Sequence, residues 1–252
     1  MEYNRYFIEL AYNGAAYHGW QRQPNAISVQ QVLEEAMSTL SREKIKLLGA
    51  GRTDAGVHAL QMYAHFDVEQ EIKNPDELVF LLNGFLNDDI AINRIIRVQT
   101  TAHARFDATE RAYQYRISTV KDPFNAPLQY YLKNQPDIEL MNQAATILLM
   151  HQDFECFSRS KTDVKTFLCN IKKAEWKKED SSLIFYISAN RFLRNMVRAI
   201  VGTLLEVGYK KRKVDDIDHV IRSKDRSVAG FSAPAHGLYL SRIKYPKNIF
   251  ID

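Results

Sequence analysis

Residues 48–59, LGAGRTDAGVHA, decide how the first half of the chain is arranged. Three glycines within eight residues flank a single carboxylate, Asp54, and Arg52 lies two positions before it. The segments on either side, 44–48 and 59–68, have the composition of strands, so the stretch predicts a tight loop between two strands. Glycines let a loop adopt positive φ and approach a ligand closely, and a nearby guanidinium keeps a carboxylate ionised. The alternative is an ordinary Gly-Asp turn with a surface ion pair.

The composition of the 252-residue chain is that of a soluble globular protein, with 46% hydrophobic and 25% charged residues. Its net charge of +4 is compatible with a polyanionic partner but does not by itself indicate one. Two cysteines, Cys156 and Cys169, imply no disulfide framework. The first residues lack the apolar run of a signal peptide, and no apolar stretch reaches the length of a membrane span. We therefore expect a cytoplasmic protein without membrane association.

Outward from the Asp54 loop, the first half alternates between strand and helix patterns. Ser28 with Gln31 forms a capping-box pattern at the start of a helix with an apolar face. The predicted elements are a strand at 6–12, a helix at 28–40, strands at 44–48 and 59–68, a helix at 75–86 and a strand at 90–98. This β-α-β-β-α-β order is that of a ferredoxin-like unit.

Residues 13–24 form a predicted loop rich in glycine, aromatic rings and amides, including Trp20 and Gln21. Such a loop can stack on nucleobases and hydrogen-bond their edges. The alternative is a hydrophobic loop in which Trp20 fills the core, and composition alone does not separate the two.

The second half repeats this organisation approximately. A strand at 111–120 places Tyr113 and Tyr115 on one face, where an aromatic packing pair is the alternative to a substrate contact. Residues 121–137 contain three prolines and predict a crossover, which divides the chain into domains 1–120 and 121–252. The later predicted elements are helices at 138–150, 190–207 and 214–223, and strands at 171–176, 183–189 and 238–243.

The predicted helix at 190–207 carries Arg191, Arg194 and Arg198 at i, i+3 and i+7, which would form one cationic face. No acidic residue lies among them to neutralise the charge. The pattern suits RNA phosphates or a buried carboxylate, and a solvated basic surface is the alternative.

Several kinds of chemistry have no signature in this sequence. There is no paired Cys or His cluster for a metal, no phosphate-binding glycine fingerprint with its following helix, and no nucleophile elbow. The histidines His58, His65 and His103 are scattered, which favours structural roles over general base catalysis. One carboxylate, several arginines and clustered aromatic rings remain, so we expect no metal and no cofactor.

Eight motifs, in the same order and over nearly the whole chain, resemble those of the TruA family of tRNA pseudouridine synthases. One such string would be weak evidence, but eight in order are specific. They are YNGAAYHGWQ at 12–21, SVQQVLE at 28–34, GRTDAGVHA at 51–59, AHARF at 102–106, RAYQY at 111–115, DFECF at 153–157, FLRNMVRAIVG at 192–202 and APAHGL at 233–238.

The resemblance implies a role for particular residues. Asp54 corresponds to the catalytic aspartate, with Arg52 and Arg198 as arginines of the site and Arg198 as the ion-pair partner of Asp54. Tyr113 corresponds to a tyrosine that stacks on the target base and takes part in proton transfer. We expect further substrate contacts from the following residues of the matching motifs: Trp20, Gln21, His58, Arg105 and Arg194.

The resemblance also implies a fold and partners. The fold would be α+β, a mixed, largely antiparallel sheet built from two ferredoxin-like (RRM-like) halves that flank a central catalytic cleft. The enzyme would act as a homodimer, without a cofactor, on uridines 38, 39 and 40 of the tRNA anticodon arm. The chain departs from the family at three positions: Asn87 replaces a usual proline, Asn170 a common arginine and Ser232 a usual threonine.

Two other classes of protein fit parts of the pattern. A non-catalytic RNA-binding protein with paired RRM-like halves would explain the arginines and aromatics. It would not need a carboxylate framed by glycines, since a negative charge facing phosphates repels the ligand. A small-molecule isomerase or hydrolase would leave the arginines and the Trp20 loop unexplained.

Overall fold

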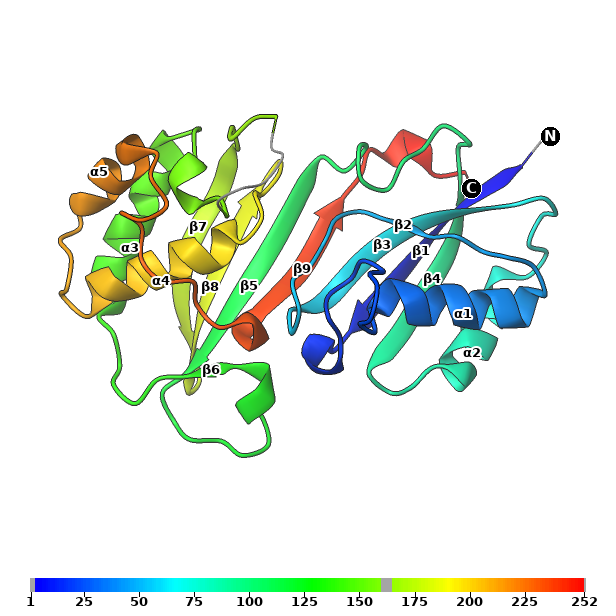
Figure 1. Ribbon diagram of the computed structural model, residues 1–252, viewed down its shortest axis with the longest axis horizontal. Coiled ribbons are helices and arrows are strands. Elements are labelled where there is room, and N and C mark those ends of the chain that lie inside the picture. Colours follow the sequence, from blue (N-terminus) through cyan, green and yellow to red (C-terminus); the bar gives the residue numbers. More distant parts are fainter. Residues whose placement is uncertain (1–2, 160–164, 252) are drawn as a thin grey trace. The chain divides into compact units, whose positions relative to one another are not determined.

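The computed structural model describes residues 3–159 and 165–251, and the chain forms two compact units (Figure 1). The first unit comprises Met1–Thr109 and Leu240–Asp252, and the second comprises Glu110–Tyr239. The sequence places its boundary within 121–137, whereas the units separate before the strand Glu110–Ser118, and the C-terminal segment rejoins the first unit. Among the described residues, no helix is both long and apolar enough to cross a membrane.

The first unit is built on strands in the order β4-β1-β3-β9, with β2 beside β3. Strand β1 pairs antiparallel with both β3 and β4. Two helices, α1 and α2, lie against these strands (Figure 1). The bounds are β1 Asn4–Tyr12, α1 Val29–Ser41, β2 Leu48–Gly49, β3 His58–Val68, α2 Pro75–Phe85, β4 Ile90–Val98 and β9 Leu238–Lys244.

Helix α1 begins where the sequence predicts. The Ser28 side chain caps it by accepting a hydrogen bond from Gln31 N at 3.3 Å, whereas the Gln31 amide bonds Glu35 and does not return to the cap. The predicted strand at 44–48 is wrong except at its last residue. Leu47 N donates to the Glu34 carboxylate and Leu47 O accepts from the Gln30 amide, so helix side chains take the place of a strand partner.

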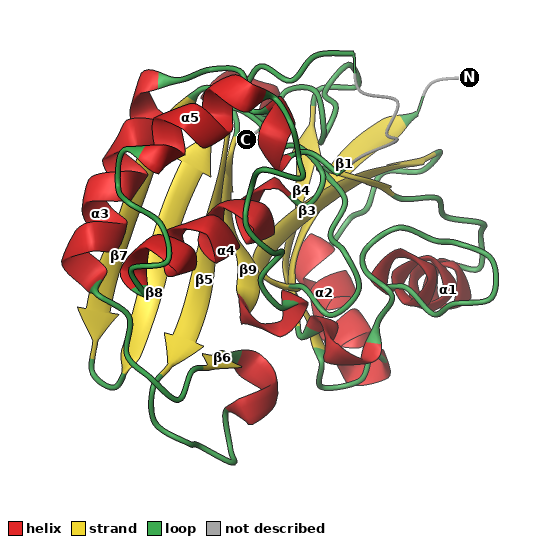
Figure 2. Ribbon diagram, turned by 60° about the vertical axis from the view of Figure 1, so that its left-hand side comes forward, coloured by secondary structure: helices red, strands yellow, loops and turns green. Residues whose placement is uncertain are grey.

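The second unit contains antiparallel strands in the order β5-β8-β7, with β6 added in parallel beside β5, so its sheet is mixed. Helices α3, α4 and α5 cover one face of these strands (Figure 2). The bounds are β5 Glu110–Ser118, β6 Tyr130–Tyr131, α3 Ile138–Ile147, β7 Ile171–Glu179, β8 Ser182–Ala189, α4 Met196–Gly208 and α5 Asp216–Ser223.

Helix α4 starts six residues later than the sequence predicts. Asn195, immediately before it, has φ 67°, a left-handed conformation that interrupts a right-handed helix. Arg191 and Arg194 therefore precede the helix, and only Arg198 belongs to it. The cationic helix face predicted from their spacing is not formed. From Met196 onward α4 is almost entirely buried, which explains why its apolar periodicity was strong enough to suggest a longer helix.

Candidate active site

The Asp54 loop joins β2 to β3, as the glycine pattern predicts. Asp54 is half-buried and Arg52 is exposed. Val57 N donates to Asp54 O at 3.1 Å, which closes a turn around the carboxylate-bearing residue. Gly56 completes this turn at φ 76°, a conformation that side chains with a Cβ rarely adopt.

The loop is braced by the end of β1 and by the segment that follows it. The Tyr12 hydroxyl and Thr53 Oγ1 are hydrogen-bonded at 2.9 Å, and Gly56 N donates to Tyr17 O at 3.2 Å. Trp20 N donates to Thr53 O at 3.4 Å. These bonds act on both sides of Asp54, so the N-terminal motif fixes the backbone that presents the carboxylate.

Two positions of the N-terminal motif require glycine, because the backbone of the Asp54 loop lies too close to leave room for a side chain. A Cβ at Gly14 would lie 2.0 Å from Val57 O, and a Cβ at Gly19 would lie 2.2 Å from Thr53 O. Gly19 also has φ +86°. The sequence indicated that glycines near Asp54 matter, but it did not reveal that Gly14 and Gly19 contact the same loop from another segment.

Trp20 and His58 are buried beside the Asp54 loop and help to position it, and their contact with RNA stays a prediction. Only 2% of the Trp20 surface is exposed, and its indole lies where a Cβ on Gly49 would be. His58 is 1% exposed, and its Nδ1 accepts a hydrogen bond from Gly14 N at 3.0 Å. The core-filling alternative for Trp20 is therefore the one that the structure supports. Gln21 is exposed, and its contact with substrate stays a prediction.

Arg105 lies in an exposed turn of the first unit. Its guanidinium carbon is 5.8 Å from the centre of the Phe106 ring, and that ring packs on His103 while remaining 74% exposed. His103 Nδ1 accepts from the backbone N–H groups of Arg105 and Phe106, which fixes the turn. An arginine and an aromatic ring are thus held at the surface, and their contact with RNA stays a prediction.

The two histidines beneath that turn are structural. Burial lowers the pKa of His65 to about 4, with the nearby Arg5 guanidinium acting in the same direction. Its Nδ1 accepts from Ala104 N at 3.2 Å, which requires an unprotonated nitrogen. Burial also lowers the pKa of His103. Both rings are held neutral at physiological pH and support the backbone of the turn.

Tyr113 lies on β5 in the second unit and is half-buried. Its ring meets Phe192 edge-to-face, with centroids 5.1 Å apart and an interplanar angle of 90°. Tyr115, two residues on, is fully buried and donates its hydroxyl to Pro234 O at 2.9 Å. The two tyrosines therefore differ: Tyr115 is buried in the core, while Tyr113 remains partly exposed on β5.

Arg198 is in the first turn of α4 and is tied to the loop that precedes β9. Its Nε donates to Ala233 O at 2.6 Å, and Ala233 N donates to Arg198 O at 3.0 Å. Ser232 supports this loop, because its hydroxyl bonds both Asn195 at 2.7 Å and Arg226 at 2.9 Å. Serine supplies the same hydroxyl as the threonine usual at this position, so the departure leaves the contact possible.

The predicted site residues belong to both units. Asp54, Arg52, Gln21 and Arg105 lie in the first, and Tyr113, Arg194 and Arg198 lie in the second, where Arg194 is exposed just before α4. Within the described part of the chain, no three metal-ligating side chains come together. Sequence reasoning missed the residues that hold these segments in place, chiefly Tyr12 and Thr53 at the Asp54 loop and Ser232 at the loop before β9.

Comparison with known proteins identifies the family. A family model described as tRNA pseudouridine synthase matches residues 10–107 and 144–246. Proteins named tRNA pseudouridine synthase A from Bacteroides fragilis and Parabacteroides distasonis are each 52% identical to this chain. The first match covers 99% of this chain and all of the relative, and the second covers 98% of each. One from Acetivibrio thermocellus is 41% identical over 94% of this chain and 97% of the relative. The chain belongs to the tRNA pseudouridine synthase family.

Proposed function

We propose that the protein isomerises uridine to pseudouridine at positions 38, 39 and 40 of the tRNA anticodon stem-loop, with Asp54 as its catalytic carboxylate. The observation that carries this proposal is the Asp54 loop, a half-buried carboxylate on a turn held by hydrogen bonds from the N-terminal motif. An ordinary surface turn needs no such bracing.

The reaction rearranges one nucleotide. The N1–C1′ bond breaks, the uracil turns, and C5 forms a bond to C1′, while C5 loses a proton and N1 gains one. A carboxylate near C1′ can add covalently or stabilise an oxocarbenium-like centre. Asp54 would supply that carboxylate, and Arg52 and Arg198 would be the arginines of the same site.

The target base must first leave the RNA stack, which costs a few kcal/mol. Stacking on an aromatic ring returns roughly 1–3 kcal/mol per base. Tyr113 is suited to this role, because its ring is half-exposed and Phe192 holds it edge-to-face. Its hydroxyl is also the candidate for proton transfer at the base.

The remaining expectations belong to the same proposal. The two units would be ferredoxin-like halves and the domains of the enzyme, the protein would act as a cytoplasmic homodimer, and one tRNA would contact both subunits. The strand-helix alternation within each unit supports the first of these. Light scattering of the purified protein at micromolar concentration tests the dimer directly.

The decisive experiment uses unmodified tRNA transcripts with uridines at positions 38–40. We expect the purified protein, without added metal, to produce pseudouridine there, detected by carbodiimide labelling and primer extension. Asp54→Asn should keep the fold and the tRNA affinity and abolish the product.

Other outcomes separate the competing classes. Tight tRNA binding without product would indicate a non-catalytic RNA-binding protein, and conversion of free uridine would indicate a small-molecule enzyme. Full turnover by Asp54→Asn would remove Asp54 from the chemistry.

A further inference from the structure

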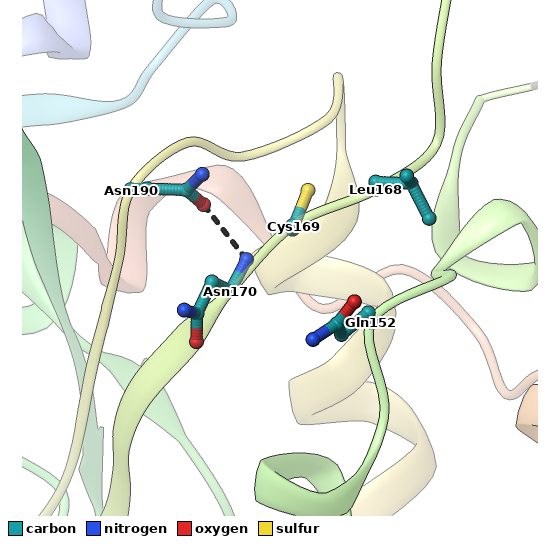
Figure 3. Close-up of a pocket in the computed structure, with 5 residues that line it drawn as sticks. All are labelled: Gln152, Leu168, Cys169, Asn170 and Asn190. Carbon is teal, nitrogen blue, oxygen red and sulfur yellow. Dashed lines mark hydrogen bonds between the residues drawn. The ribbon is translucent and has the colours of Figure 1, made fainter.

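A second candidate site lies in the second unit, at a small open pocket of about 200 Å³ (Figure 3). Three carboxamide residues and two others line it: Gln152, Asn170, Asn190, Leu168 and Cys169. The lining comes from three separate segments, namely the irregular stretch after α3, the approach to β7 and the residue after β8. None of these residues is assigned a role in the reaction above.

The carboxamides are available for a ligand. Asn190 Oδ1 accepts from Asn170 N at 2.7 Å and from Arg191 N at 2.9 Å, which fixes its orientation and leaves its NH₂ group as a donor. Within the described residues, this NH₂ group and the side-chain amides of Gln152 and Asn170 make no hydrogen bond. All three residues are exposed, and so is 54% of Leu168.

The walls of the pocket are tied together by the backbone. Cys169 N donates to Gln152 O at 2.8 Å, and Asn190 N donates to Asn170 O at 3.2 Å. These bonds hold the amide-bearing segments in one arrangement. A preorganised set of donors and acceptors binds a polar ligand with a smaller loss of conformational freedom.

The segments around the pocket carry positive charge. Arg191, next to Asn190, donates from Nη1 to Thr166 O at 3.3 Å, which places its guanidinium beside the strand approach that contains Leu168. Arg159 N donates to Arg194 O at 3.1 Å, so these two arginines also share one part of the surface. The neighbouring carboxylate of Asp153 is paired with Lys224 at 2.7 Å.

We propose that this pocket, hereafter the carboxamide pocket, binds an unpaired nucleobase of the tRNA substrate other than the target uridine. Asparagine and glutamine amides present the paired donors and acceptors that base edges require. Leu168 supplies apolar contact for the base, and the adjacent arginines meet its flanking phosphates. The inference rests on the proposed function, since it concerns how that substrate is held.

The first test compares affinity for a tRNA transcript at several salt concentrations. Gln152→Ala/Asn170→Ala should weaken binding about 10-fold at every salt concentration, a loss in line with one well-formed base contact. The slope of its log affinity against log salt concentration should equal that of the parent, because the substitutions remove no charge. Arg194→Ala should instead lower the slope by about one. Asn93→Ala removes an exposed amide from β4 and serves as the matched control, with parental affinity.

The second test locates the base. Transcripts that carry a single abasic site at successive unpaired positions should bind the parent protein about 10-fold more weakly at one position. At that position alone, Gln152→Ala/Asn170→Ala should cause no further loss. For each protein, the test compares its affinities for two RNAs. The comparison is therefore valid even if the variant is less stable than the parent.

Two results would overturn the proposal. One is a double variant that binds tRNA as tightly as the parent protein, and the other is an equal loss of affinity in the double variant for every abasic transcript. With product formation by the parent intact, such results would leave the catalytic function standing. If the parent neither binds tRNA nor forms pseudouridine, both proposals fail together. A third result would also overturn the proposal. If a protein binds at this pocket and the double variant keeps its affinity for tRNA, the pocket belongs to another class of ligand.

Discussion

At the scale of single residues, the conformation of the Asp54 loop depends on atoms that lie far from Asp54 in sequence. Thr53 illustrates this, because its hydroxyl bonds Tyr12 and its carbonyl accepts from Trp20 N. The residue before the carboxylate is thus held by both its side chain and its backbone. Substitutions of the residues that contact this loop from the N-terminal motif, such as Tyr12 and Gly19, should therefore affect activity through the loop backbone.

Gly19→Ala is the sharpest such substitution. The new Cβ would lie 2.2 Å from Thr53 O at φ +86°, so the backbone of one of the two segments must move. We expect a drop of at least about 10-fold in kcat/KM together with a lower melting temperature, since misplacement by 1 Å can cost that much. Gly51→Ala is the matched control, because a Cβ there meets no atom within 4 Å. Equal melting temperatures for the two variants would contradict the bracing role.

His65 predicts how stability changes with pH. Its pKa of about 4 in the folded state lies below the ordinary value of 6.5, so the unfolded chain takes up this proton first as pH falls. The contribution of His65 to the free energy of unfolding is fully present above pH 6.5. It is lost as the pH falls toward 4, by about 3 kcal/mol in total. Urea unfolding of the parent and of His65→Gln at pH 7, 5.5 and 4 measures it. The variant should have the shallower dependence, and identical curves would refute the assignment.

At the scale of elements, sequence periodicity predicted most element types correctly, but it misplaced several ends and predicted a strand over 44–47 that is absent. Strand β3 and helices α1 and α2 lie within a residue or two of their predicted bounds, because apolar alternation and caps are local signals. The start of α4 was missed because Asn195 adopts the left-handed conformation, which is stabilised by its contact with Ser232, 37 residues away. A sequence pattern spanning a few residues around Asn195 does not include Ser232, so the start of the helix could not be predicted from it.

The outermost strand of each unit is protected by the same device. Asn83 on α2 bonds both backbone groups of Ile92 on β4, at 2.7 and 2.9 Å. Asn142 on α3 bonds both backbone groups of Trp176 on β7, at 2.7 and 3.0 Å. A side-chain amide thus replaces a neighbouring strand and makes the edge less able to pair with another chain.

Removing either amide should destabilise its unit. Asn83→Ala and Asn142→Ala each leave backbone groups without their partners, and we expect each to lower the free energy of unfolding by about 1–3 kcal/mol. Asn93→Ala, which removes an exposed amide from β4, should change it by less than about 0.5 kcal/mol. Urea denaturation gives these values, and equal stabilities for all three variants would show that water replaces the amides without cost.

At the scale of the whole molecule, the division of the chain was the least predictable feature. The proline-rich segment 121–137 resembles a linker, yet the compact units separate before Glu110, and residues 240–252 complete the first unit. Pairing of β5 with β8 and contacts of the C-terminal segment with β1 decide this, and such long-range contacts leave no periodic trace in sequence. The Asp54 loop was predictable because its glycine motif is local, and its catalytic role stays a prediction, whereas the contacts that hold the loop and the carboxamide pocket are assembled from distant segments.

The C-terminal segment should therefore stabilise the first unit from the far end of the chain. Tyr245 packs edge-on against Phe7 and Tyr63, with ring centroids 5.1 and 5.2 Å away, and its hydroxyl donates to Ala104 O at 2.6 Å. Tyr245→Phe removes the hydroxyl with its hydrogen bond to Ala104 O and should cost about 1 kcal/mol. Tyr245→Ala also removes the half-buried ring and should cost about 2–3 kcal/mol.

Hydrogen exchange distinguishes this from a general loss of stability. In Tyr245→Ala, amides of β1 and β3 should exchange faster, because the ring covers these strands, while amides of β8 in the second unit should keep their protection. Faster exchange in both units would mean that they unfold as one cooperative body. Unchanged exchange in β1 would mean that the first unit is complete without its C-terminal segment, and the return of the chain to that unit would then have no role in its stability.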